Sequence, residues 1–392
     1  MQQDDTPPLT ASHAAKPDYT ATAQARWGTR LAFFAAGLAM ASCAPLFPFF
    51  KANVGADKAE FGLVLLCLGL GSIIAMPVAG FLAARRGARS IVLIGGFGLV
   101  AFLPFLALAQ TPLALGAGLF FFGASLGTID VAMNVHGAEV ERLERRPLMS
   151  NFHAQFSIGG LCGAGLVTLL LSATVPVLHA ACIGAVITLI AVLCTRSRLL
   201  VVSGTAPEPY ALPKGIVLLL SVLAGISFLV EGAVLDWGAL LIIDRDLTAP
   251  QNAGIGYILL SVAMVIARLS GDYTVATVGE FRVLILGGLV TIAGISAVLV
   301  LPGTLMALFG FILIGLGVAN LVPILFSAAG RQKVMPPGLA IASVTTTGYA
   351  GILLGPAIIG FVADASSLIT AFWMLALLIA CVPLTARFVV RA

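Results

Sequence analysis

The sequence predicts an all-α membrane protein whose twelve transmembrane helices form two six-helix halves. Composition is the first reason, because 60% of the 392 residues are hydrophobic and 10% are charged, whereas a soluble domain carries about 25% charged residues. The second reason is a series of twelve apolar runs, each near or above the roughly 20 residues that a helix needs to cross a bilayer. The third reason is the alternation of basic residues between successive loops.

The twelve apolar runs follow one another with short breaks. Frequent glycine, and proline within several runs, is typical of membrane helices, because neighbouring helices satisfy the backbone groups that these residues free. The expected spans are residues 31–50, 61–83, 90–109, 112–135, 148–171, 175–195, 214–243, 252–270, 283–302, 303–327, 338–362 and 366–388.

The chain divides at residues 197–213, the longest break on one side of the expected membrane, which contains glycine and proline. We therefore expect an N-terminal half over residues 28–196 and a C-terminal half over residues 214–392. Residues 1–27 are polar and have no apolar core before a small-residue cleavage site, so we expect a disordered cytoplasmic tail and no signal peptide.

The basic residues predict the orientation of the chain. Eighteen of the 21 Lys and Arg residues fall on the side that carries both termini, and only Lys51, Lys58 and Arg245 fall on the other side. This positive-inside bias predicts cytoplasmic termini, and it explains the net charge of +4 without a nucleic-acid partner. The six cysteines lie in apolar runs without paired spacing, so we expect neither a disulfide framework nor a metal site.

The two halves also resemble each other in sequence. A shift of roughly 190 residues carries Pro147 onto Pro337 and Asp130 onto Asn320. A slightly larger shift carries the glycine pair at 95–96 onto the pair at 287–288. A parallel repeat with an even number of spans in each half predicts a pseudo-two-fold axis along the membrane normal.

One apolar run carries an acid inside it. Residues 113–134 are long enough to cross a bilayer, yet they contain Asp130 and Asn134, and an Asp at the centre of a membrane helix costs about 3 kcal/mol. The spacing of four places both side chains on one helical face, which Gly123 and Gly127 continue. We expect this face to lie against other helices or a wet cavity.

A loop motif between the second and third spans indicates a family. The segment at residues 80–89 is similar to the G-x-x-x-D-R-x-G-R-R loop of the major facilitator superfamily, and twelve helices with a central cytoplasmic loop are also typical of that superfamily. The acid of the motif is replaced by Ala84. The resemblance implies a gating role for the residues that match and for two residues that we expect in the equivalent loop of the second half: Gly80, Arg85, Arg86, Gly87 and Arg89, with Arg268 and Asp272.

Two further segments narrow the resemblance. They are similar to a bacterial inner-membrane branch of YbjJ-type proteins, which is distantly similar to fucose permeases. The first is Asp130-Val-Ala-Met-Asn134 followed by the stretch from Arg146 to His153, and the second runs from Glu231 to Trp237. In this superfamily helices 1, 4, 7 and 10 line the central cavity. The resemblance therefore implies that their polar residues bind solute or protons: Ser42, Asp130, Asn134, Ser227, Glu231, Asp236, Trp237 and Asn320.

Three roles are open for the acids Asp130 and Glu231. Because burial disfavours a charged carboxylate, either can bind a proton and release it when the cavity becomes wet. Either can instead bind the hydroxyl or cationic groups of a solute, or form a structural ion pair. Asp130 lies about 27 Å along its helix from Pro112, and Glu231 about 25 Å from Lys214, so we expect them at different depths and not in contact.

Two ring-bearing residues have alternative roles. Trp237 can stack on a solute or anchor its helix at the membrane interface. His153 can shuttle protons or hydrogen-bond Asp130 across a helix pair, or it can simply be satisfied at its own helix end.

The remaining polar residues are expected nearer the cytoplasm. For Arg268, we favour a gate or loop contact with Asp272 over substrate binding. His136, Glu139 and Arg142 are expected to form a solvated, salt-bridged face.

The sequence thus predicts a secondary transporter that moves a small, polar organic solute by alternating access, coupled to protons. We expect a monomer in the bacterial cytoplasmic membrane whose partners are the solute and the lipid bilayer, with no cofactor. Two alternatives stay open: an exporter of amphipathic compounds, and a membrane sensor that binds ligand without moving it. An enzyme is disfavoured, because the sequence shows no metal-ligand cluster, nucleophile-base pair or phosphate-binding loop.

Overall fold

The computed structural model describes residues 19–56, 58–200, 212–247 and 255–392, and every regular element within them is a helix. Twelve helical stretches in this part of the chain are long and apolar enough to cross a membrane, which confirms the expected number of spans. The first helix begins at Tyr19, inside the segment expected to be a disordered tail. The rest of that tail, residues 1–18, and most of the expected linker, residues 201–211, lie outside the described residues.

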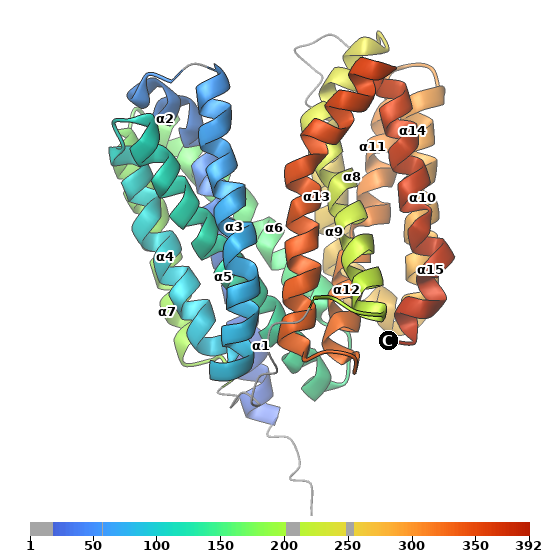
Figure 1. Cartoon of the computed structure of the whole chain (residues 1–392), viewed down its shortest axis with the longest axis horizontal. Helices are drawn as coiled ribbons and strands as arrows, with labels where there is room; N and C mark the ends of the chain where they lie inside the picture. Colours follow the sequence, from blue (N-terminus) through green and yellow to red (C-terminus); the bar gives the residue numbers. More distant parts are fainter. Residues whose placement is uncertain (1–18, 57, 201–211, 248–254) are drawn as a thin grey trace, which may run out of the picture.

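The first half of the chain folds into one bundle of six spans (Figure 1). The tightest packing within it joins the second span to the fourth and the first to the fifth. A short helix after the first span lies outside the membrane core. The elements are α1 (Tyr19–Cys43), the 3-10 turn η1 (Ala44–Leu46), α2 (Phe47–Val54), α3 (Lys58–Arg86), α4 (Ala88–Leu108), α5 (Pro112–Glu144), α6 (Met149–Ser172) and α7 (Val177–Arg196).

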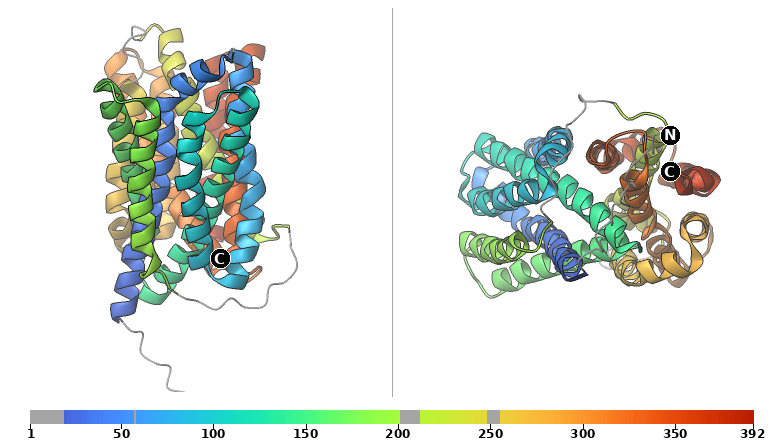
Figure 2. Two further views of the ribbon diagram at one scale, coloured as in Figure 1. Left: turned by 90° about the vertical axis from the view of Figure 1, so that its left-hand side faces the viewer. Right: turned by 90° about the horizontal axis from the view of Figure 1, so that it is seen from below.

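The second half of the chain forms a second bundle, and the view from below shows the two bundles side by side (Figure 2). Two of its spans are interrupted and are therefore each divided into two helices. The elements are α8 (Ile216–Asp244), α9 (Ile255–Val278), α10 (Glu280–Val300), α11 (Thr304–Val318), α12 (Leu321–Arg331), α13 (Pro337–Ala365), α14 (Leu368–Ile379) and α15 (Cys381–Val390).

The turns before α4 and α10 show the internal repeat in the backbone. Gly87 and Gly279 each precede a helix of 21 residues, with φ of 80° and 87° and ψ of 149° and 145°. A side chain is strained at these positive φ values, so both turns favour glycine. The two halves thus build the same turn at equivalent places in the chain.

The break between α11 and α12 has a simple cause. Pro323 has no N–H, so it cannot donate the helical hydrogen bond to the carbonyl oxygen of Ala319, four residues earlier. The span that was expected to be continuous over residues 303–327 is interrupted at Ala319 and Asn320. One carbonyl oxygen is therefore free in the middle of the span.

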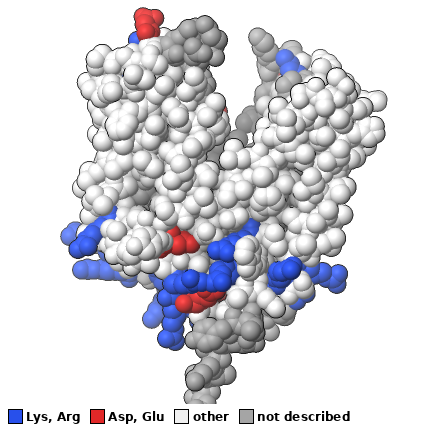
Figure 3. All heavy atoms as spheres, turned by 180° about the vertical axis from the view of Figure 1, so that it is seen from behind, with Lys and Arg blue, Asp and Glu red and all other residues white. Residues whose placement is uncertain are grey.

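The two bundles separate toward one end of the molecule. Figure 3 shows a wedge-shaped hollow between them, open at the end opposite a band of Lys and Arg. We call the end with this band the basic end; its described members include Arg85, Arg86, Arg142, Arg146, Arg196, Arg331 and Lys333.

Contacts between the bundles near the basic end close the hollow there. Helix α3 packs against α13 so closely that a Cβ on Gly338 would lie 3.0 Å from the carbonyl oxygen of Gly80. Helix α5 packs against α12, where a Cβ on Gly330 would lie 2.6 Å from the Cβ of Ala138. Small residues thus allow the helices of the two bundles to approach closely.

Candidate functional site

Arg268 is the centre of a polar cluster between the two bundles. It lies near the midpoint of α9 and is 6% exposed. Its Nη2 donates to Glu231 Oε1 at 3.2 Å, and its Nη1 donates to Ser157 Oγ at 3.1 Å. Its Nε donates to the carbonyl oxygen of Ala319 at 3.1 Å, the group left free by Pro323.

This cluster joins the two bundles. Glu231 on α8 and Arg268 belong to the second bundle, whereas Ser157 on α6 belongs to the first. The side chains of Arg268 and Glu231 are 8% and 18% exposed, so their ion pair is largely removed from water. Removing one partner of such a pair leaves an uncompensated buried charge, which makes the pair sensitive to any change in the charge of Glu231.

Asp130 lies in a different environment, on α5 of the first bundle. It is 8% exposed, and among the described residues no cation forms an ion pair with it. Asn134 Nδ2 donates to the Asp130 carbonyl oxygen at 2.9 Å and lies 3.5 Å from Asp130 Oδ1. Tyr349 on α13 of the second bundle lies within electrostatic reach of Asp130. The carboxyl group therefore also lies where the bundles meet.

The glycines that share the face of Asp130 pack against a neighbouring helix. A Cβ on Gly127 would lie 2.6 Å from the carbonyl oxygen of Ser72 on α3, and Gly123 is similarly close to Leu68. Ser72 Oγ donates to the Gly123 carbonyl oxygen at 2.8 Å. Close packing on α3 thus fixes the depth and rotation of the α5 face that presents Asp130.

Two buried amides have unused acceptors at this level. Asn320, at the break between α11 and α12, donates through Nδ2 to the carbonyl oxygen of Ala267 at 3.2 Å. Its Oδ1 and the Oδ1 of Asn134 are buried and have no hydrogen-bond partner among the described residues. An acceptor without a donor in such a place costs roughly 1–3 kcal/mol. Asn320 Oδ1 faces α9, where a Cβ on Gly271 would clash with it, so Asn134 Oδ1 is the better placed of the two to accept from a ligand.

His153 on α6 lies between two phenylalanine rings. Its ring centroid is 5.2 Å from that of Phe33 and 5.5 Å from that of Phe326, which lies in the other bundle. Its Nδ1 is 3.0 Å from the carbonyl oxygen of Met149 and therefore carries the proton of a neutral ring. The structure shows no hydrogen bond between His153 and Asp130, so its described contacts match the alternative of a histidine satisfied at its own helix end.

Asp236 and Trp237 lie further along α8, toward the open end. Asp236 is exposed, whereas the ring of Trp237 packs against α13, where a Cβ on Gly360 would lie 3.3 Å from it. The indole Nε1 of Trp237 is buried without a partner among the described residues. Neither residue contacts Arg268 or Asp130 in the described structure.

The expected contact between Arg268 and Asp272 is wrong. Both lie inside α9, which continues to Val278, so they are not in a loop; the loop equivalent to the first-half motif is the turn at Gly279. Asp272 Oδ1 instead accepts from the backbone N–H of Asn151 at 3.2 Å, in the first turn of α6. The first N–H groups of a helix lack intrahelical partners and favour negative charge, which explains this choice.

Asp272 takes part in the closure of the basic end. Asn151 belongs to the first bundle and Asp272 to the second, and Arg30 Nε on α1 donates to Asn151 Oδ1 at 2.8 Å. Glu141 on α5 accepts from the backbone N–H groups of Leu148 and Met149 at 2.8 Å and 3.0 Å. The start of α6 is thus held by acids from both bundles.

The motif residues of the first half lie at the same end. Gly80 contacts α13, whereas Arg85 is exposed and lies with its Cζ 5.3 Å from the ring centre of Phe81. Arg86 is exposed, Arg89 is half-buried, and Gly87 forms the turn described above. Ala84, where the superfamily motif has an acid, packs against Gly338, so this loop closes through small residues and lacks a carboxylate.

The prediction of a solvated, salt-bridged face formed by His136, Glu139 and Arg142 is only partly correct. Glu139 and Arg142 form the expected ion pair at 2.6 Å. His136, however, is 2% exposed: its Nε2 accepts from the backbone N–H of Leu200 at 2.9 Å, and its Nδ1 lies 2.8 Å from Thr29 Oγ1. Two partners from distant parts of the chain therefore hold it as a structural residue.

Three groups at the interface were not predicted from the sequence: Ser157 and the Ala319 carbonyl oxygen in the Arg268 cluster, and Asn151 at the basic end. Ser157 and Asn151 lie in a polar start of α6 that also contains Ser150, His153 and Gln155, and nothing in their spacing indicates a partner in the other bundle. The Ala319 carbonyl oxygen had one signal, Pro323, because a proline inside a helical run always frees a carbonyl oxygen four residues earlier.

Comparison with known proteins identifies the family to which this architecture belongs. The sequence profile of the Major Facilitator Superfamily matches residues 30–336. The chain is 45% identical over 365 residues to an uncharacterized MFS-type transporter of Yersinia pestis, covering 93% of this chain and 95% of that protein.

Two solved structures share the fold at low sequence identity. The fucose:proton symporter of E. coli is 16% identical, with a TM-score of 0.74 over 93% of this chain and 98% of that chain. The human organic anion transporter MFSD10 is 15% identical, with a TM-score of 0.76 over 94% of this chain and 99% of that chain.

Proposed function

The chain belongs to the Major Facilitator Superfamily and is a secondary transporter, and from this premise we propose that it moves a small, polar organic solute together with a proton by alternating access. The observation that carries the proposal is the contact of Arg268 with Glu231 and Ser157 between the bundles. A fold shared by a sugar symporter and an organic anion transporter does not specify a solute. The chemistry of this site must therefore do so.

Proton coupling is supported by the difference between the two buried carboxyl groups. Glu231 has a cation beside it, so a proton on Glu231 removes the attraction that holds Arg268 in place. Asp130 has no such cation, and its charge is therefore costly in an apolar surrounding unless it takes up a proton. Each carboxyl group can thus exchange a proton with the hollow, and at Glu231 this exchange also changes the contact between the bundles.

The class of solute follows from the unused acceptors. Asn134 Oδ1 lacks a donor among the described residues, and the neighbouring carboxyl group of Asp130 has free acceptor capacity. Hydroxyl and amino groups supply such donors, whereas a carboxylate solute does not. We therefore propose a hydroxylated or amino-bearing solute and disfavour an organic anion.

Alternating access requires the contacts at the basic end to open and the hollow at the other end to close. The closure includes single hydrogen bonds and glycine contacts, such as Asp272 to Asn151 and Gly80 to Gly338. A hydrogen bond of this kind can be exchanged for another as the bundles move. With the basic end and both termini in the cytoplasm of a bacterial inner membrane, the described state opens outward. We propose that a monomer suffices, since both bundles and the site belong to one chain.

The first experiment records external pH in lightly buffered, energy-starved cells that make this protein while sugars, sugar acids, amino acids and small amines are added. An alkaline shift with one compound supports proton symport. An acid shift would indicate export by exchange, and silence across the panel followed by saturable binding of a compound would indicate a sensor; either result would contradict the proposal.

The second step tests the site with variants. In the double variant Asp130→Asn, Glu231→Gln the pH shift should disappear, whereas the control Asp364→Asn, Glu139→Gln changes two acids outside the site and should behave like the wild type. Transport by the first double variant at the wild-type rate with unchanged pH dependence would contradict the roles proposed for both acids.

A further inference from the structure

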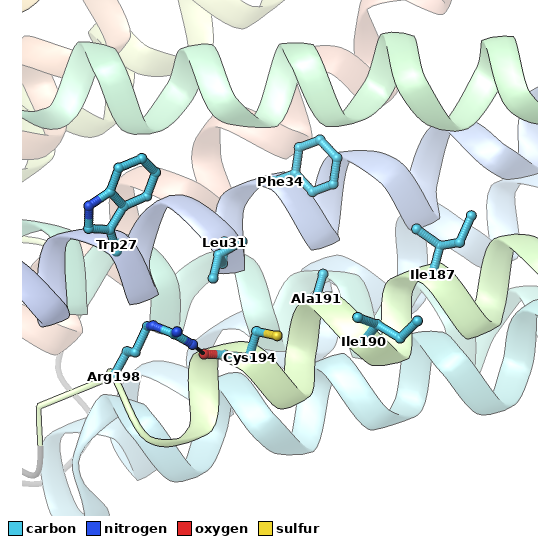
Figure 4. A pocket seen from close by; sticks show the side chains of 8 residues that line it. All are labelled: Trp27, Leu31, Phe34, Ile187, Ile190, Ala191, Cys194 and Arg198. Carbon is cyan, nitrogen blue, oxygen red and sulfur yellow. Dashed lines mark hydrogen bonds between the residues drawn. The ribbon is translucent and has the colours of Figure 1, made fainter.

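A groove on the outer surface of the first bundle lies apart from the transport site. It runs between α1 and α7 near the basic end and has a volume of about 530 Å³. Figure 4 shows Arg198 and Trp27 at one end of the groove and Ile187 at the other. The helices of the second bundle do not line it.

The groove is polar at one end and apolar along its length. Leu31 and Phe34 on α1 face Ile187 and Ile190 on α7, and Ile190 is 56% exposed. The nine helical steps from Ile187 to Arg196, the last residue of α7, span about 14 Å, roughly half of the 30 Å hydrocarbon core. The groove therefore covers about one leaflet, with its polar end at the level of the head groups.

The polar end carries positive charge that is not neutralised. Among the described residues no carboxylate forms an ion pair with Arg198, which is exposed and donates through Nη1 to the Cys194 carbonyl oxygen at 2.6 Å. Arg30, whose Nε donates to Asn151 at the basic end, lies beyond the lining of the groove with its Cζ 4.8 Å from the ring centre of Trp27. Basic pockets between membrane helices on this side are suited to anionic head groups, and tryptophan is typical of the head-group level.

The position of Arg198 is fixed by close packing. The chain leaves α7 directly over α1, where a Cβ on Gly28 would lie 2.9 Å from the Cβ of Arg198. Packing against Gly28 fixes the Cβ of Arg198, and the hydrogen bond to the Cys194 carbonyl oxygen orients its guanidinium at the mouth of the groove.

We propose that this groove binds one anionic phospholipid of the leaflet at the basic end. Its phosphate lies at Arg198, and one acyl chain lies along Phe34, Ile187 and Ile190. A zwitterionic lipid fills the same apolar groove but offers no net negative charge to the guanidinium group of Arg198, so the site prefers phosphatidylglycerol to phosphatidylcholine.

Trp27 provides a direct measurement, because only two other tryptophans, Trp237 and Trp373, must be replaced by Phe. The full-length single-tryptophan protein is placed in vesicles of phosphatidylcholine that contain a small share of either lipid, brominated near the head-group end of one acyl chain. We expect brominated phosphatidylglycerol to quench Trp27 fluorescence at least about twofold more than brominated phosphatidylcholine. This expectation is modest, because even a tenfold preference for one lipid requires a difference of only about 1.4 kcal/mol in binding free energy.

Two arginines at the same helix end make a matched pair. Arg198→Ala should abolish the preference for phosphatidylglycerol, whereas Arg196→Ala, which removes an exposed arginine outside the groove, should keep it. Equal quenching by the two lipids, or a preference that survives Arg198→Ala, would overturn the proposal. If the single-tryptophan protein does not fold, native mass spectrometry of the otherwise wild-type chain with a mixture of both lipids gives the same comparison, and equal retention of the two lipids would overturn the proposal.

Discussion

The two acids at the level of the site, Glu231 and Asp130, have different surroundings although the sequence presents them alike. Glu231 has Arg268 at 3.2 Å, and through Arg268 it is connected to Ser157 of the other bundle. Asp130 has an amide at 3.5 Å and no ion-pair partner in the part of the chain that the structure describes.

The difference assigns separate tasks to the two acids. Glu231 pairs with Arg268, which also contacts the other bundle, so in the proposed mechanism we expect a change at Glu231 to alter conformation. Asp130 pairs with no cation among the described residues, so we expect a change at Asp130 to alter mainly what the hollow can bind. In the proposed mechanism one acid therefore controls the state of the transporter, and the other controls the coupling of solute and proton.

The largest expected effect is that of Arg268→Gln. It leaves Glu231 buried without a cation, which costs about 3–5 kcal/mol in comparable buried pairs. We expect a clear drop in apparent melting temperature of the purified protein. The deficit should shrink as the pH falls, because protonation of Glu231 removes the unpaired charge.

The double variant Arg268→Gln, Glu231→Gln is the control for this effect. Because it removes both charges, it should recover most of the lost thermal stability without recovering transport. If the double variant is as unstable as Arg268→Gln alone, the ion pair is not the source of the effect, and the contrast between the two acids fails.

Asp130→Asn should have the next largest effect, and on function instead of stability. A pH difference of about two units supplies about 2.7 kcal/mol per proton, enough for roughly hundredfold accumulation of solute. We expect this variant to lose that accumulation in proteoliposomes but to keep exchange of labelled for unlabelled solute. Asp364→Asn is the control, and uphill accumulation by Asp130→Asn would show that Asp130 does not couple transport to protons.

Part of this comparison could be predicted from the sequence and part could not. The apolar runs and the distribution of Lys and Arg are enough to predict twelve spans, and Asp130 and Glu231 are conspicuous because acids are rare inside such runs. Their surroundings depend on the rotation and depth of helices that are distant in the chain. Periodicity indicates which residues share a face, but it does not indicate which helix that face meets.

Arg268 illustrates the limit of predicting side-chain partners from the sequence alone. The motif predicts that Arg268 and Asp272 meet in a loop at the end of their span. In the structure Asp272 instead accepts from an N–H group at the start of α6, and Arg268 donates to the acid on α8. The end of α9 was also expected too early, which placed Arg268 near the cytoplasm and not near the midpoint of the helix. Local rules failed here because competing partners came from other helices.

Ser157→Ala is expected to have an intermediate effect. It removes the acceptor that the first bundle offers to Arg268 Nη1, and a hydrogen bond to a charged group contributes roughly 1.5–3 kcal/mol. We expect distances between spin labels on the two bundles to shift toward a state that is open at the basic end. Ser270→Ala, which changes an exposed serine on α9, should leave the distances unchanged. The same shift in both variants would show that the bond from Arg268 to Ser157 does not hold the bundles together.

Asp272→Asn should produce the smallest effect. The amide oxygen of Asn can still accept from the Asn151 N–H, so the variant loses only the interaction of a charge with the start of α6, about 0.5–1 kcal/mol. That amount corresponds to roughly a twofold to fivefold change in the ratio of the two states. Spin-label distances between α6 and α9 should show this redistribution without a drop in melting temperature. A change as large as that of Arg268→Gln would mean that the basic-end contact, and not the Arg268 cluster, holds the bundles together.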